Sequence, residues 1–132
     1  MKKIILSIML LASSSVVASG MNEQMAFDYE LNKYSLTLTP AERWTMKSVI
    51  AFMDSNKAAI EANCGIELKT FETAGSNFME IQNEAIKRVA HDANYENAAN
   101  NIPVNYEKIE FESQASFASL ISCSKKLYNE KK

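Results

Sequence analysis

The stretch TPAERWTMKSVIAFMDSNKAAIEANCG, residues 39–65, decides the fold class of this chain because it combines a helix start signal with a cysteine. Thr39 can cap a first helical turn, Pro40 suits a position whose N–H has no partner, and Glu42 completes a capping box. Apolar residues then recur at helical spacing, at Met46, Val49, Ile50, Met53, Ile60 and Cys64. This pattern predicts a helix that begins at Thr39 and ends at Gly65, and Asp54-Ser55-Asn56 is a point where it can divide into two.

Two further stretches have the same periodicity. A second helix is predicted after Gly75, with Ser76 as its cap, and extends to about Ala93. The last helix is predicted to begin near Ser113. Its apolar face consists of Phe117, Leu120, Ile121, Leu127 and Tyr128. The expected fold class is therefore all-α, a small helical bundle.

Two other segments allow more than one interpretation. Between residues 27 and 38, apolar and polar residues alternate on both sides of Asn32-Lys33, which is typical of a short β-hairpin near the N-terminus. The spacing of Phe27, Leu31 and Tyr34 is equally compatible with a helix. Residues 94–105 contain five asparagines and Pro103, and this composition predicts a long polar loop or a frayed helix end that passes into a loop.

The two cysteines predict one disulfide that pins the bundle. Cys64 lies at the end of the apolar stripe of the helix from Thr39, and Cys123 lies between Leu120 and Leu127 on the apolar face of the last helix. Both sulfur atoms are therefore expected in the core. No second cysteine lies two or three residues from either one, so the spacing of redox and haem-attachment motifs is absent from the sequence.

The first 18 residues predict export from a bacterial cytosol. A basic start at Lys2 and Lys3 precedes an apolar run, and Val16-Val17-Ala18 is a small-residue cleavage signature, so residues 1–18 are interpreted as a signal peptide. Residues 19–132 are then one small helical domain of ordinary size, expected in the periplasm or secreted. The run is too short for a stable membrane anchor. The sequence has no cysteine near the cleavage site, so a lipid anchor is not expected.

Charge and motif content argue against several function classes. The whole chain has a net charge of −2, and the loss of Lys2 and Lys3 with the signal peptide makes this −4, which argues against nucleic acid as a partner. The chain has one histidine, His91, followed by Asp92, and it lacks the metal-binding and phosphate-binding motifs. The acidic group Glu107, Glu110 and Glu112 is typical of a solvated face. The sequence therefore predicts no enzyme, no metal and no cofactor.

The remaining class is recognition of a protein partner by a loop on a disulfide-pinned scaffold. Loops on stable frames carry binding function disproportionately, and asparagine side chains offer donors and acceptors without charge. Trp44 lies off the main apolar stripe and is a second candidate anchor. The predicted contact residues are Asn94, Tyr95, Asn97, Asn100, Asn101, Pro103 and Trp44.

A resemblance gives this prediction a more specific form. The features that carry it are the export signal, the two distant cysteines, and a C-terminal pattern of Asn94-Tyr95, Pro103-Val104, Tyr106, Phe117, Leu120, Cys123 and Leu127-Tyr128. In these features the last third of the chain resembles periplasmic immunity proteins that act against type VI secretion amidases. The resemblance implies inhibition of a cell-wall-degrading toxin by an inserted loop or helix, and it assigns no individual inhibitory residue. The alternatives are an accessory or chaperone-like factor of an envelope or secretion system, and a helical bundle that binds a small ligand.

Overall fold

A computed structural model describes the backbone of residues 14–92 and 94–131, and the side chains of residues 23–89 and 94–131. These residues are mostly helical, without a strand among them. The helices are α1 (Ser14–Ser35), α2 (Pro40–Ser55), α3 (Lys57–Asp92), α4 (Tyr95–Asn100) and α5 (Tyr106–Lys131). The predicted all-α fold class is confirmed. Residues 1–13 of the predicted signal peptide lie outside the described residues, and residues 14–18 form the start of α1.

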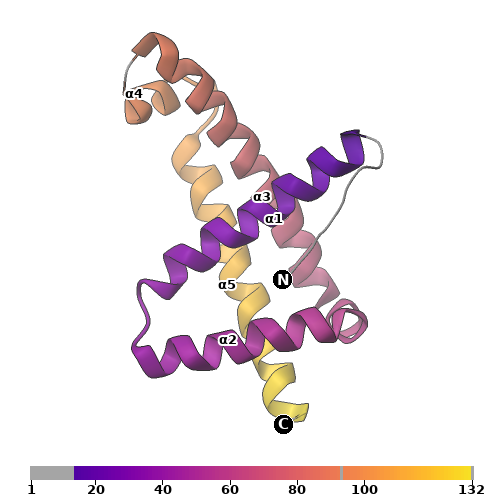
Figure 1. Ribbon diagram of the computed structural model, residues 1–132. Coiled ribbons are helices and arrows are strands. Elements are labelled where there is room, and N and C mark those ends of the chain that lie inside the picture. The colour runs from indigo at the N-terminus through magenta and orange to yellow at the C-terminus, as the bar shows by residue number, and fades with distance from the viewer. Residues whose placement is uncertain (1–13, 93, 132) are drawn as a thin grey trace.

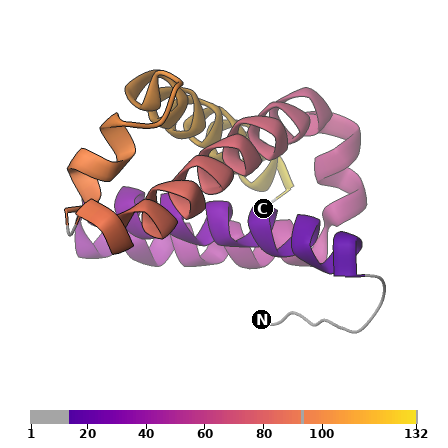
Figure 2. The same cartoon turned by 90° about the horizontal axis from the view of Figure 1, so that it is seen from above.

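The helices are arranged in two layers. Figure 1 shows α3 and α5 side by side and antiparallel, with α1 and α2 crossing in front of them. The view from above in Figure 2 shows α1 and α2 together on one side of the α3–α5 pair. Helix α4 lies at one end of the molecule, where the chain turns from α3 into α5. The α3–α5 pair is therefore the centre of the fold.

The local signals at both ends of α2 are confirmed. The Thr39 side chain accepts a hydrogen bond from the Glu42 N–H at 3.2 Å, and the Thr39 N–H donates to Glu42 Oε1 at 2.8 Å, so the capping box forms. The predicted division at Asp54-Ser55-Asn56 also occurs. The Asn56 N–H donates to the Phe52 carbonyl at 3.0 Å, and the Asn56 carbonyl accepts from the Ile60 N–H at 3.0 Å, so Asn56 ends α2 and starts α3.

Helix α3 confirms one prediction and corrects another. Gly65 was expected to end a helix, and α3 consists of two helical segments that meet at a kink at Cys64, directly before Gly65, where φ is −125° and ψ is 27°. Gly75 was expected to precede a helix, but the second segment of α3 runs through it. Gly75 is a packing position, because a Cβ there would lie 2.9 Å from the Cβ of Ala26 on α1 and 3.2 Å from the Phe71 ring. The absent side chain allows α1 and α3 to approach closely. Tertiary packing has overridden the weak helix propensity of glycine.

The predicted β-hairpin is wrong, and the helical interpretation of that segment is correct. Residues up to Ser35 belong to α1, and its apolar face packs on the core through aromatic contacts. The Phe27 ring centroid lies 5.4 Å from that of Phe117, and the Tyr34 centroid lies 6.1 Å from the same ring. A helix allows both residues to reach Phe117, because positions seven apart share a face.

The last helix begins earlier than predicted, at Tyr106 rather than near Ser113. Its start is fixed by Asn105, whose Oδ1 accepts a hydrogen bond from the Lys108 N–H at 3.0 Å. Asparagine is a favoured residue at a helix N-terminus because its side chain satisfies a backbone donor that has no helical partner.

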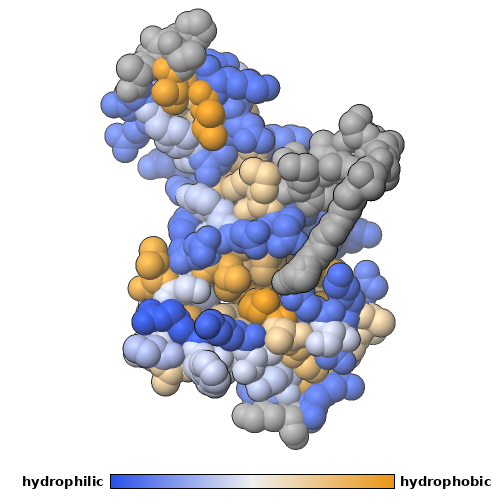
Figure 3. All heavy atoms as spheres, in the orientation of Figure 1, coloured by the Kyte–Doolittle hydropathy of each residue, from blue (hydrophilic) through white to orange (hydrophobic). Residues whose placement is uncertain are grey.

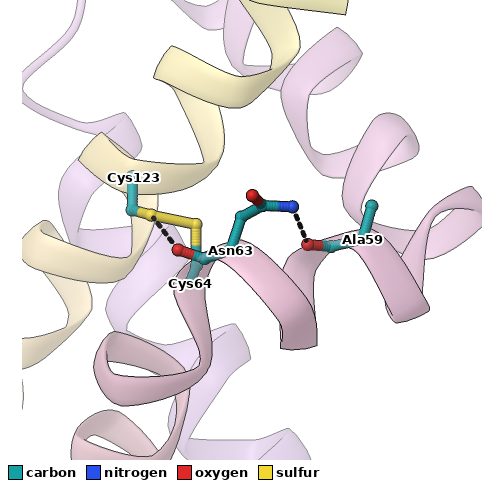
Figure 4. The surroundings of a disulfide bond; sticks show 4 residues. All are labelled: Ala59, Asn63, Cys64 and Cys123. Carbon is teal, nitrogen blue, oxygen red and sulfur yellow. Dashed lines mark hydrogen bonds between the residues drawn. A yellow bond between two sulfur atoms is a disulfide. The ribbon is translucent and has the colours of Figure 1, made fainter.

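The predicted disulfide is confirmed and lies at the bend of α3. Cys64 and Cys123 are bonded, with their Cα atoms 6.0 Å apart, and Cys64 is fully buried in the main core. Figure 4 shows the sulfur bridge between the bend and α5. Cys123 Sγ also lies 3.6 Å from the Asn63 carbonyl oxygen, a van der Waals contact because a bridged sulfur has no proton to donate. The bridge fixes the bend of α3 against α5.

Candidate functional site

The predicted polar loop is a short, capped helix that folds back on α3. The Asn94 side chain accepts a hydrogen bond from the Asn97 N–H at 2.9 Å and starts α4. Ala99 and the following Ile102 are buried against Ala85 of α3, in a small core that is separate from the main one. The interpretation of this segment as a long loop is therefore wrong. A helix forms here because apolar residues that stand between the asparagines in the sequence are buried against α3.

A second set of contacts holds this corner, defined here as residues 94–104, in place. Arg88, which belongs to α3, donates a hydrogen bond of 3.2 Å to the Asn101 carbonyl oxygen. The Tyr106 hydroxyl donates to Gln82 Oε1 at 3.2 Å, and the Tyr95 hydroxyl lies 3.3 Å from it, so Tyr95 donates to Tyr106. Burial raises the pKa of Tyr106 far above its ordinary value. Tyr106 therefore keeps its proton and acts as a fixed link between α3 and the corner.

The structure brings six of the seven predicted contact residues together on the corner. Asn94, Tyr95, Asn97, Asn100, Asn101 and Pro103 are all exposed there. Tyr95 and Val104 are among the large apolar or aromatic side chains that solvent reaches. In Figure 3 hydrophobic atoms are visible among hydrophilic ones at this end of the molecule. The corner thus combines amide groups with apolar surface on a fixed frame.

Trp44, the seventh predicted residue, lies elsewhere. It belongs to α2, at the opposite end of the molecule from α4 (Figure 1). Its side chain is 72% exposed, and Lys47 Nζ lies 6.0 Å from the centre of its ring. Trp44 is therefore exposed as expected, but it cannot contribute to the same contact patch as the corner.

Sequence reasoning missed a groove between α3 and α5. It has a volume of about 770 Å³, and its lining comes from these two helices alone. Ile66 is 82% exposed and Phe111 is 68% exposed, one on each helix, and small residues such as Ala74 and Ala115 lie between them. In the sequence Phe111 stands between Glu110 and Glu112, two residues typical of a solvated face. This position was the signal that Phe111 is exposed. Large exposed apolar residues bordering one groove indicate an interaction site.

A buried carboxylate was also missed. Glu30 on α1 is 3% exposed and accepts a hydrogen bond from the buried Ser113 hydroxyl of α5 at 2.8 Å. Burial raises the pKa of Glu30, while the Ser113 hydrogen bond and the nearby Lys33 ammonium oppose the rise. Lys33 in turn pairs with Glu110 of α5 at 3.6 Å. These contacts join α1 to α5. Glu30 shares a helical face with Phe27 and Tyr34, which was the signal that could have found it.

Within residues 23–89 and 94–131, no three His, Cys, Asp or Glu side chains are grouped so that they could hold a metal ion. The His91 side chain lies outside the described ones. A search of the described helices for a stretch long and apolar enough to cross a membrane found none.

Comparisons with known proteins add no assignment: no protein-family model, no curated protein and no solved structure matches this chain.

Proposed function

We propose that this chain is an exported protein that binds and inhibits a protein partner, with the corner of residues 94–104 as its principal contact surface. The observation that carries the proposal is the grouping of six predicted contact residues on this one exposed and internally bonded corner. The disulfide supports export, because disulfides persist in oxidising compartments such as the periplasm.

The corner has the properties that a protein contact requires. Asparagine amides supply both donors and acceptors, and Tyr95 supplies apolar area beside a hydroxyl. Capping at Asn94 and the small core under α4 fix the backbone before binding. A prefixed surface loses less conformational entropy on association, which favours affinity. The partner class that the sequence resemblance suggests is a cell-wall-degrading toxin.

The test is a pull-down of tagged, disulfide-bonded protein of residues 19–132 from envelope and culture fractions, followed by mass spectrometry. Replacement of Asn97 and Asn100 by Ala is expected to weaken capture of the partner at least tenfold. The matched control replaces Gln114 and Asn129 of α5, which removes two exposed amides elsewhere. Circular dichroism verifies that both variants fold. Equal capture by the two variants would contradict the corner as the contact surface.

A second candidate function is an accessory or chaperone-like factor, and the α3–α5 groove favours it. A helical segment of an envelope or secretion component would lay its apolar face between Ile66 and Phe111. The same pull-down separates the two functions. Replacing Ile66 and Phe111 by Ser should abolish capture of an accessory partner and leave capture through the corner unchanged.

A further inference from the structure

A second cavity lies between α1, α2 and the first half of α3. It has a volume of about 490 Å³, which is within the range of small-molecule sites. Its walls include the apolar residues Phe27, Leu31, Met53, Ile60, Leu68 and Phe71. Figure 3 shows hydrophobic atoms exposed between the hydrophilic outer surfaces of α1 and α2 on this face. The cavity can therefore bury an apolar body of small-molecule size.

The charges around this cavity are almost all negative. Among the described side chains, its lining includes the carboxylates of Glu23, Asp28, Asp54, Glu61 and Glu72 and one ammonium group, that of Lys57. Neither of the ion pairs found among the described side chains involves any of these carboxylates. Glu23 and Glu72 face each other from α1 and α3 closely enough to repel, and burial together with Glu72 raises the pKa of Glu23. A positive charge placed here would relieve this repulsion.

We infer that this cavity binds a small amphipathic cation, with its apolar body against Phe27, Leu31 and Met53 and its charged nitrogen among the rim carboxylates. Apolar walls alone would accept any hydrophobic molecule of this size. The excess of carboxylates favours a cation over a neutral or anionic molecule with the same apolar body. Each carboxylate within about 6 Å of the charged nitrogen contributes a Coulombic attraction that solvent screens only in part. This inference does not depend on the protein-binding proposal, since the cavity shares no lining residue with the corner.

The experiment uses three probes with the same tail and different head groups: octylammonium, octanol and octanoate. Each is titrated into the disulfide-bonded protein of residues 19–132, which carries carbon-13 methyl-labelled methionine. The Met53 methyl signal reports on the cavity, and the buried Met46 and Met79, which do not line it, serve as internal references. Octylammonium is expected to bind at least tenfold more tightly than octanol, octanoate least tightly, and the preference should shrink at high salt.

Two charge variants on α3 sharpen the test. Glu72→Gln should weaken octylammonium binding by about three- to tenfold and leave octanol binding unchanged. Glu80→Gln makes the same change on the same helix outside the cavity and should alter neither. Saturable shifts at Met53 with this order of probes and variants support the inference. Equal affinity for octylammonium and octanol, equal effects of the two variants, or no saturable shift at Met53 would each overturn it.

Discussion

The disulfide is the feature whose energetic contribution follows most directly from the structure. It joins residues 59 positions apart, and replacing Cys64 and Cys123 together by Ala opens that loop in the unfolded chain. In the loop-entropy model a closure of this length stabilises the folded state by about 4 kcal/mol. The folded state of a small domain is commonly only about 5 to 15 kcal/mol more stable than the unfolded state. Loss of the bridge is therefore expected to remove a large part of the total stability.

Packing adds a second contribution in the double variant. The Cys64 side chain is fully buried in the main core, so its replacement by Ala removes a sulfur atom and leaves a small void worth about 1 kcal/mol. Reduction of the wild type opens the same loop but keeps both sulfur atoms, as thiols, so no heavy atom is lost from the core. We therefore expect a loss of about 4 kcal/mol for the reduced wild type and about 5 kcal/mol for the double variant.

Urea unfolding followed by far-ultraviolet circular dichroism measures these losses. The oxidised wild type, the reduced wild type and the double variant are compared at one pH and one temperature, with free energies extrapolated linearly to water. A loss below about 1 kcal/mol on reduction would refute the reasoning, because it would mean that the unfolded chain is already restricted without the bridge. A double variant clearly more stable than the reduced wild type would refute the packing contribution.

Four further predictions concern single positions or segments. Gly75→Ala should lower the free energy of unfolding by about 1 to 3 kcal/mol through a collision with the neighbouring helix. Gly65→Ala, with open space at its Cβ, should raise the free energy of unfolding by about 0.5 to 1 kcal/mol. Equal shifts of the urea midpoint in the two glycine variants would contradict this difference. Burial raises the pKa of Glu30 above 4.5, so the folded state binds more protons than the unfolded state in the window above pH 4.5, and wild-type stability falls as pH rises through it. The stability of Glu30→Gln relative to the wild type should therefore increase through that window, and parallel pH curves would contradict this. Tyr106→Phe removes two hydroxyl contacts and should cost about 1 to 2 kcal/mol in urea unfolding, so an unchanged midpoint would count against the link. Amides of residues 94–105 should exchange with deuterium faster than those of α5 near the disulfide, and the reverse order would contradict the small size of the core beneath them.

Local signals in the sequence predicted the parts of the fold that local chemistry controls. The capping box at Thr39 and Glu42 and the helix junction at Asn56 depend on hydrogen bonds between near neighbours, and both form. Gly75 failed as a signal because its role is contact with α1, which no local pattern records. The hairpin between residues 27 and 38 failed because alternation and helical spacing coexist there, and only packing on Phe117 decides between them.

The candidate sites were predictable only in part. The exposed amides of the corner were visible as an asparagine-rich segment, but the buried Ala98 and Ala99 that make it a helix were not distinguished from their polar neighbours. Ile66 and Phe111 look like ordinary members of helical stripes until the structure leaves the groove between them unfilled. The cavity carboxylates come from three helices, so their grouping is a property of the tertiary structure alone.

The molecule contains two separate cores of very different size, and the proposed contact surface lies over the smaller one. The main core contains large aromatic side chains such as Phe71, Phe78 and Phe117 together with the disulfide-bonded Cys64. The core under α4 has far fewer buried residues, namely Ala85, Ala99 and Ile102, so it buries less apolar area and contributes correspondingly less stability. Local opening of the corner therefore requires much less free energy than unfolding of the bundle. The stability of the bundle therefore depends little on the corner, so substitutions at exposed corner residues can change binding while the α3–α5 pair remains intact.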